Sequence, residues 1–277
     1  MIIKPVTRIA AALAGAALLL GAAPVFAQDD VGARIDRAMT GEHRSDRNMA
    51  RDRYRHPKET LLFFGLEPQM TVVEITPGAG WYSEILVPVL RDSGTFYGAI
   101  YQIGEGSPDI IKRLDGMYRG LLASNPALYD QVKLSVFDPA APVFAPAGTA
   151  DMVLTFRNVH NWAKAGNIDL MVKGFYDALK PGGVLGVTDH RAKPGTPFQR
   201  QIDSGYMTEQ YVIEVIEKAG FKLANKSEIN ANPLDTADHP GGVWNLPPNL
   251  RNVSDADRAR FLSIGESDRM TLKFVKP

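Results

Sequence analysis

The sequence predicts an α/β protein with a mostly parallel sheet of seven strands flanked by helices. Short β-branched or apolar runs alternate with stretches of helical periodicity, and Gly- or Pro-containing turns separate them. This alternation is typical of parallel sheets, because parallel neighbours need a crossover connection that is usually a helix. Ligands in such sheets bind beyond the carboxyl ends of the strands, where the strand order reverses. We therefore expect functional residues directly after strands.

The strands and helices follow one another along the chain. Strands are predicted over 70–75, 95–101, 132–137, 151–156, 184–187, 221–226 and 270–276. Helical spacing predicts helices over 81–90, 110–122, 168–179 and 208–219. Pro88 is expected to kink the first of these or to shift its end, and Lys180-Pro-Gly-Gly183 is expected to end the third. Thr208 is expected to cap the fourth, and Ser254-Asp-Ala-Asp257 predicts a further short helix.

The chain is expected to divide into three parts. Residues 1–27 predict a secretory signal peptide, because a basic start and a short apolar run lead to small residues before a cleavage point after Ala27. A retained anchor is the alternative, but the run is short for a span of ~20 residues. Residues 28–60 predict an N-terminal helical arm and 61–277 the α/β domain. The Pro- and Gly-rich stretch 230–252 predicts a lid or a surface excursion.

Composition excludes several function classes. The 277 residues hold 31 Lys and Arg against 31 Asp and Glu, so the charge expected of a nucleic-acid-binding protein is missing. The chain has no cysteine, which excludes disulfides, thiolate metal ligands and a cysteine nucleophile. After cleavage we expect a periplasmic or secreted protein without stable membrane insertion.

A glycine turn between the first strand and the first helix is the first chemical signal. Gly78 and Gly80 lack Cβ atoms, so a ligand can lie against the backbone, with Glu74 near the strand end. Ser83 stands where a dinucleotide fingerprint needs a third glycine. The turn either binds a ligand or only packs the helix on the strand. The sequence has neither a P-loop nor a Gly-x-Ser-x-Gly elbow.

Two turns of the chain carry longer motifs, Val73-Glu-Ile-x-Pro-Gly-x-Gly80 and Ala178-Leu-Lys-Pro-Gly-Gly-Val184. The first resembles the first motif of class I S-adenosylmethionine-dependent methyltransferases, and the second resembles the turn before their fifth strand. Asp151–Trp162 resembles their fourth strand with its following loop. Tyr54–Leu66, Gly80-Trp-Tyr82 and Asp189-His-Arg191 are similar to a group of exported, predicted methyltransferases. The resemblance covers about residues 50–277.

This resemblance implies a Rossmann-like class I methyltransferase fold, S-adenosyl-L-methionine as cofactor and a small-molecule acceptor. The glycine turn would face the methionine part of the cofactor, and Asp138 the adenine amine. Tyr101 stands where the family offers an acid to the ribose hydroxyls. Arg157 and Asn158 would lie near the methyl group. The implied cofactor positions are Glu74, Gly78, Ala79, Gly80, Tyr101, Asp138, Arg157 and Asn158.

Two histidines are candidates for the base that methyl transfer to an O or N acceptor requires. His160 follows the fourth strand, and His190 follows Asp189 at the end of the fifth. Either histidine could instead order its loop through hydrogen bonds. Together with Asp189 they could hold a metal, but the sequence shows no metal-binding spacing, so none is predicted.

Two other function classes stay open. S-adenosylmethionine is made in the cytoplasm, and Tyr101 departs from the family pattern, so an exported, non-catalytic small-molecule-binding protein on the same fold is the first alternative. A structural or interaction module is the second, expected only if side chains fill the pocket. The enzyme hypothesis requires a cavity between the tips of the first and fourth strands.

Overall fold

The computed structural model describes residues 1–2 and 30–277. Apart from its first two residues, the expected signal peptide (1–27) lies with its cleavage point outside the described residues. Within the described part of the chain, no helix combines the length and the apolar character needed to cross a membrane.

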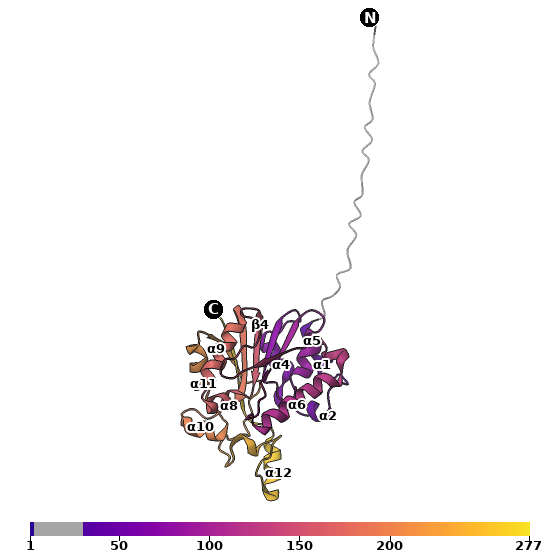
Figure 1. The fold of residues 1–277 in the computed structure, drawn as a ribbon. Helices are drawn as coiled ribbons and strands as arrows, with labels where there is room; N and C mark the ends of the chain where they lie inside the picture. The colour runs from indigo at the N-terminus through magenta and orange to yellow at the C-terminus, as the bar shows by residue number, and fades with distance from the viewer. Residues whose placement is uncertain (3–29) are drawn as a thin grey trace.

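A seven-stranded sheet in the order β3-β2-β1-β4-β5-β7-β6 forms the centre of the protein (Figure 1). Strand β7 alone runs antiparallel, between β5 and β6. The strands are β1 (Thr71–Ile75), β2 (Thr95–Tyr101), β3 (Lys133–Phe137), β4 (Ala150–Phe156), β5 (Leu179–His190), β6 (Lys222–Ser227) and β7 (Arg269–Val275). The predicted fold class and all predicted strands are confirmed.

Helices cover both faces of the sheet. One hydrophobic cluster joins the sheet to α8, α9 and α11, and a second joins it to α1, α4 and α5. Figure 1 shows these two groups of helices on opposite sides of the strands. The helices are α1 (Val31–Met39), α2 (Asp46–Met49), α3 (Asp52–Arg55), α4 (Pro57–Phe64), α5 (Ser83–Leu90), α6 (Asp109–Ser124), α7 (Pro126–Tyr129), α8 (Val159–Ala165), α9 (Ile168–Ala178), α10 (Phe198–Ser204), α11 (Glu209–Lys218) and α12 (Asp255–Ile264).

Local sequence signals explain several of these boundaries. The Thr208 hydroxyl accepts a hydrogen bond from the backbone N–H of Tyr211, and Ser254 caps α12 in the same way. Pro88 lies inside α5 without ending it. The prediction that the turn at 180–183 lies outside the strands is wrong. These residues belong to β5, whose pairing with β4 shifts register between Ala150 and Met152.

The N-terminal segment packs onto the α/β domain. Helices α1 to α4 occupy 31–64, and the last of them runs past residue 60 to Phe64. Ile35 of α1 is fully buried in the same cluster as Ile85 and Leu86 of α5. The segment is therefore part of the packing on one face of the sheet.

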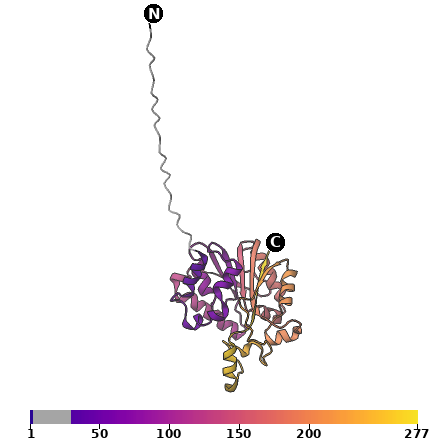
Figure 2. The same ribbon diagram turned by 180° about the vertical axis from the view of Figure 1, so that it is seen from behind.

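The stretch 230–252 contains one short helical turn, η1 (Gly242–Asn245), and otherwise turns and extended backbone. It precedes α12 and β7, and the first residue of β7, Arg269, pairs with His190 at the carboxyl end of β5. The stretch and α12 therefore lie at the carboxyl edge of the parallel strands, where both views show α12 projecting (Figure 2).

Candidate functional site

The strand order reverses between β1 and β4. From β1 the chain proceeds to β2 and β3 on one side, and β4 lies on the other side. Asn158, two residues after β4, bridges the two strands at their carboxyl ends. Its Nδ2 donates to the Ile75 carbonyl at 3.2 Å and to Thr155 Oγ1 at 3.1 Å. A ligand-binding crevice is expected at this point of a doubly wound sheet.

A cavity of about 250 Å³ lies there. The expected opening between the tips of the first and fourth strands is thus confirmed, and side chains do not fill it. One wall is apolar and comes mainly from α6, and polar groups come from the strand tips. The lining residues are Thr76, Pro77, Gly78, Ile100, Tyr101, Ile103, Ile110, Ile111, Leu114, Asp115, Asn158 and Asn161.

The two glycines of the turn have different surroundings. Both have left-handed φ angles, +64° at Gly78 and +89° at Gly80. A Cβ on Gly78 would meet nothing within 4 Å, so its backbone faces open space. A Cβ on Gly80 would lie 2.3 Å from Leu121 Cδ2 and 3.2 Å from the Tyr118 ring. Gly78 therefore lines the cavity, whereas Gly80 allows α6 to approach the turn. Ala79 is exposed and does not line the cavity.

Glu74 is buried on β1 and does not line the cavity. The Ser83 hydroxyl donates to Glu74 Oε2 at 2.6 Å, and Ser83 Oγ also lies 3.1 Å from the Tyr118 hydroxyl. Burial raises the pKa of Glu74 to about 8, although the hydrogen bond from Ser83 opposes the shift. Glu74 is therefore mainly protonated at neutral pH.

Tyr101, Asp138 and Asp115 occupy the part of the edge around β2 and β3. Tyr101 lines the cavity, and its hydroxyl accepts a hydrogen bond of 2.8 Å from Trp162 Nε1. Asp138 is exposed and accepts from the backbone N–H of Ala140 at 2.9 Å, beside a separate shallow depression. Among the described residues that line the cavity, the one acid is Asp115 of α6.

His160 and Asp189 form a buried pair on the β5 side of the cavity. His160 Nδ1 lies 3.0 Å from Asp189 Oδ1, and the other carboxylate oxygen accepts from the His160 backbone N–H at 3.3 Å. No hydrogen bond with another described residue engages His160 Nε2. Asp189 therefore orients the ring and leaves one nitrogen for proton transfer.

His190 has both ring nitrogens engaged. Its Nδ1 contacts the Ser267 hydroxyl, and Arg157 Nε donates to its Nε2 at 3.3 Å. Burial, reinforced by the charges of Arg157 and His160, lowers the pKa of His190 well below its usual range. A neutral ring that accepts from Arg157 places its own proton on Nδ1, toward Ser267.

The two histidines and Asp189 bring three possible metal ligands within 4.8 Å of one another. The Asp189 carboxylate already holds His160, and the Arg157 guanidinium donates to His190 Nε2. A positive charge at that position opposes metal binding. The arrangement therefore opposes metal binding at these three residues.

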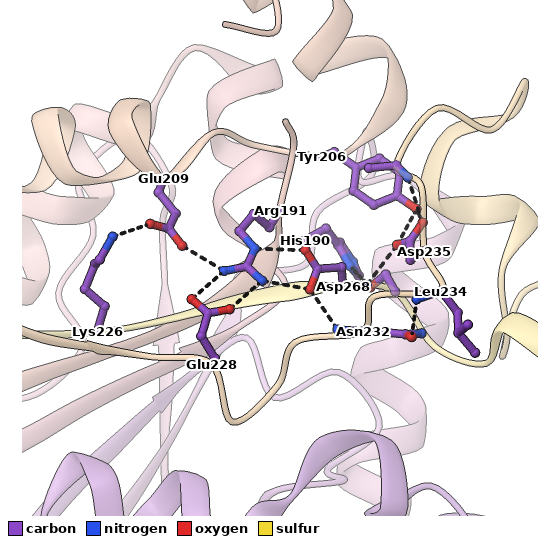
Figure 3. A network of polar contacts seen from close by, with 12 residues as sticks. His190, Arg191, Tyr206, Glu209, Lys226, Glu228, Asn232, Leu234, Asp235 and Asp268 are labelled. Carbon is purple, nitrogen blue, oxygen red and sulfur yellow. Dashed lines mark hydrogen bonds and ion pairs between the residues drawn. The ribbon is translucent and has the colours of Figure 1, made fainter. Parts of the chain in front are cut away.

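Arg191, the third residue of the Asp-His-Arg run, is held by acidic side chains and stabilises the fold (Figure 3). Two of its nitrogens donate to Asp268 at 2.8 and 3.0 Å, and the guanidinium also contacts Glu209 and Glu228. Burial opposes the charge of Arg191, but these carboxylates outweigh it and raise its pKa. The network ties the end of β5 to α11 and to the start of β7.

Asp235 anchors the stretch 230–252 to the same network. Its carboxylate accepts from the Tyr206 hydroxyl at 2.9 Å and from the Asp268 backbone N–H at 2.8 Å, and His239 Nε2 lies 2.8 Å from it. Figure 3 shows the Tyr206 and Asp268 contacts beside Arg191. Buried contacts of this kind are typical of a segment with a fixed conformation. They hold the beginning of the stretch 230–252 against the edge of the sheet.

Sequence reasoning missed the wall that α6 contributes. Thr76 and Asn161 fall in the stretches directly after strands where functional residues were expected, but the sequence did not single them out. Thr76 has φ +47°, and its buried Oγ1 has no hydrogen-bond partner among the described residues. Asn161 follows Asn158 by three residues on α8. The strand-to-turn position of Thr76 and the short polar run after β4 were available signals, whereas nothing in the sequence pairs α6 with this edge.

Comparison with known proteins supports the fold. No protein-family model matches the chain, and neither does any curated protein. A SAM-dependent methyltransferase from Aquifex aeolicus is similar in structure, with a TM-score of 0.55 and 14% identity over 89% of this chain and 98% of that one. The chain has the class I methyltransferase fold.

Two further solved structures show that proteins with this fold catalyse different reactions. Geranyl diphosphate C-methyltransferase from Streptomyces coelicolor A3(2), in complex with Mg²⁺, geranyl diphosphate and S-adenosyl-L-homocysteine, has a TM-score of 0.56 and 13% identity, over 87% of both chains. The [4+2]-cyclase SpnF has a TM-score of 0.57 and 15% identity, over 86% of this chain and 85% of that one. Because methyltransferases and a cyclase share it, the fold alone does not decide the reaction.

Proposed function

We propose that this protein is an S-adenosylmethionine-dependent methyltransferase that acts on a small-molecule acceptor. The cavity between the tips of β1 and β4 is the observation that carries the proposal. It lies at the switch point of a class I methyltransferase fold, where such sheets bind their ligands. Its apolar α6 wall and polar strand tips fit a ligand with an aromatic base and a polar chain.

The lining residues offer a contact to each part of the cofactor. When bound, S-adenosylmethionine supplies an activated methyl group on its sulfonium. The open backbone at Gly78 and the unpartnered Thr76 hydroxyl suit the polar chain. The phenol oxygen of Tyr101 accepts from Trp162, so its own proton is free for a ribose hydroxyl. Asp115 of α6 brings a carboxylate in place of the missing acid at the end of β2, and Arg119 Nε donates to both of its oxygens at 3.0 Å.

His160 is the residue that would remove a proton from an O or N acceptor. Its Nδ1 is held by Asp189, so Nε2 takes the proton and the carboxylate stabilises the resulting imidazolium. His190 is less suited to this task because both ring nitrogens are engaged. We assign His190 the role of holding Arg157 in position after β4.

Calorimetric titration with S-adenosylmethionine and S-adenosylhomocysteine tests the proposal. We expect both to bind to the wild-type chain and Gly78→Val to weaken binding at least about tenfold, because a branched side chain fills open space at the cavity. Gly148→Val is the matched control, since Gly148 has φ +62° and an equally open Cβ position away from the cavity. No binding at millimolar ligand, or equal affinity in both variants, would refute the cofactor site.

The role of His160 has its own test. We expect His160→Ala to lower methyl transfer about 10²-fold or more while changing cofactor affinity little, because general-base catalysis contributes about that much. Turnover is measured as S-adenosylhomocysteine formed, and affinity by the same calorimetry. Equal losses of both would make His160 a binding or folding residue.

The alternative function depends on export of the protein. We propose that the mature chain starts at Gln28 in the periplasm or outside the cell, which N-terminal sequencing of the mature protein would test. A mature protein that still begins with Met1 would contradict cleavage after Ala27. If the exported chain binds a small organic ligand but neither S-adenosylmethionine nor S-adenosylhomocysteine, it is a non-catalytic binding protein on this fold.

A further inference from the structure

Four arginines gather around one glutamate beside the proposed transfer site. We call this group the guanidinium cluster, and its members are Arg51, Arg55, Arg157, Arg269 and the central Glu266. Arg51 Nε lies 2.6 Å from Glu266 Oε1, Arg55 Nε lies 2.9 Å from Oε2, and Arg269 pairs with the same carboxylate. The N-terminal segment, the end of β4 and the start of β7 thus meet at one point.

The cluster holds more positive charge than its own residues balance. Glu266 pairs with three arginines, and no ion pair within the described residues engages Arg157. The Asp189 carboxylate is close enough to raise the pKa of Arg157, but it also holds His160. Four guanidinium groups therefore face two carboxylates. Buried charges are normally paired, because an unpaired charge loses its hydration without compensation.

Hydrogen-bond donors in the cluster are also unused. Arg55 and Arg269 are only 5% and 2% exposed, yet Arg55 Nη2 and Arg269 Nε have no hydrogen-bond partner among the described residues, and the Arg55 guanidinium lies over the Trp81 ring, 4.6 Å from its centroid. Arg51 Nη2 is a third such atom. Leaving a buried donor unpaired costs about 1–3 kcal/mol, so three in one cluster indicate that an acceptor is missing.

Arg157 connects the cluster to the site. It is half-buried, and its neighbour Asn158 lines the cavity. Its φ of +66° is left-handed, and its Nε donates to His190. Within the described residues no hydrogen bond engages its two terminal nitrogens. These two N–H groups form the fork that binds carboxylate or phosphate oxygens in pairs.

We propose that Arg157, backed by the guanidinium cluster, binds an oxyanion of the methyl acceptor, either a carboxylate or a phosphate group. That the anion belongs to a methyl acceptor rests on the proposed function, whereas the oxyanion site rests on the cluster alone. Arg157 and His160 both adjoin His190: Arg157 Nε lies 3.3 Å from its Nε2, and the His160 and His190 ring centroids are 5.3 Å apart. An acceptor held by its anionic end would place its nucleophilic atom toward His160.

Mutual repulsion supports the same conclusion. Burial, followed by repulsion from Arg269, lowers the pKa of Arg157 to about 10. Burial alone would raise the pKa of Glu266, but Arg55, Arg269 and Arg51 outweigh it and hold that pKa far below its usual range. A bound oxyanion would relieve this repulsion and stabilise the folded protein.

The test is calorimetric titration of the full chain with inorganic phosphate and, separately, with acetate, at ionic strength held constant with sodium chloride. We expect saturable binding of at least one anion with a dissociation constant of about 10 mM or lower. The anion that binds more tightly identifies the acceptor group as phosphate or carboxylate. Failure of both anions to bind at about 100 mM would overturn the proposal.

Variants locate the site. We expect Arg157→Gln to weaken anion binding about tenfold or more, and Arg157→Lys, which keeps the charge but loses the fork, to weaken it less. Arg260→Gln is the control, because Arg260 is an exposed arginine on α12 whose ion pair with Asp257 lies outside the cluster. Anion affinity that Arg157→Gln leaves unchanged would overturn the site.

A titration of the same samples with S-adenosylhomocysteine separates the two proposals. Binding of S-adenosylhomocysteine without any anion binding overturns the oxyanion site and leaves the methyltransferase proposal in place. Anion binding without S-adenosylhomocysteine supports the site and overturns the methyltransferase proposal. Anion binding that persists with S-adenosylhomocysteine bound supports both, because acceptor and cofactor must be bound at the same time.

Discussion

Replacement of Glu74 by glutamine removes a carboxyl group that the fold keeps protonated. Glu74 is 2% exposed on β1, and Ser83 is its side-chain partner among the described residues. Burial raises its pKa from 4.5 to about 8. Between these values the unfolded chain releases the proton while the folded protein retains it. Stability must therefore fall as the pH rises through this window, which is the opposite of the behaviour of a salt-bridged carboxylate.

The size of the effect follows from the linkage between proton binding and folding. Each tenfold difference in proton affinity corresponds to about 1.4 kcal/mol. Between about pH 5 and about pH 8, the Glu74 carboxyl then removes about 3 to 4 kcal/mol from the free energy of unfolding. The amide of the Glu74→Gln variant cannot ionise, so the variant does not lose this stability as the pH rises. Its free energy of unfolding relative to the wild-type protein should therefore increase by the same amount.

Urea unfolding followed by tryptophan fluorescence at several pH values measures this difference. Other groups also titrate, but they cancel when the variant is compared with the wild-type protein at each pH. Glu67→Gln is the control, because Glu67 is exposed and its difference should stay within about 0.5 kcal/mol. A Glu74→Gln difference that stays constant with pH, or that shrinks as the pH rises, would refute the assignment of a protonated Glu74.

Three further predictions concern stability, each measured by urea unfolding. Gly80→Ala should destabilise the fold by about 2 kcal/mol, because the new Cβ meets Leu121 and the φ angle is left-handed; unchanged stability would contradict the packing role. Arg191→Gln should cost about 2 kcal/mol by leaving Asp268 without its bidentate partner, and a loss under about 0.5 kcal/mol would show that solvent replaces it. Thr208→Ala should cost about 1 kcal/mol through the lost cap of α11, whereas Thr208→Ser should restore most of it.

The strands could be predicted from the sequence because each is a short apolar run that turn residues delimit. Helices with a clear apolar stripe, such as α9, were equally visible. Helices α8 and α10 span only 7 residues each, which is too short to show helical periodicity. The turn at 180–183 was assigned outside the strands because Pro and Gly are usually turn residues, whereas here β5 accommodates them through a register shift.

The candidate site could be predicted only where its residues directly follow a strand. The strand tips at Gly78, Tyr101 and Asn158 were found in this way, and all three line the cavity. The packing role of Gly80 could not be predicted, because its close neighbour Leu121 lies on α6, remote in sequence. The guanidinium cluster was hidden for the same reason, since it joins positions from 51 to 269.

Helix α6 forms a wall of the cavity but is weakly fastened to the protein. Of its 16 residues only Tyr118 is buried, while Ile110 and Met117 are about half exposed. A helix with so few internal contacts opens at a lower free energy than the sheet behind it. Its amide hydrogens should exchange with deuterium sooner than those of α9. The rate at which a large molecule enters the crevice would then depend on how often α6 detaches from the sheet. A ligand that contacts the isoleucines of α6 would slow hydrogen exchange in this helix.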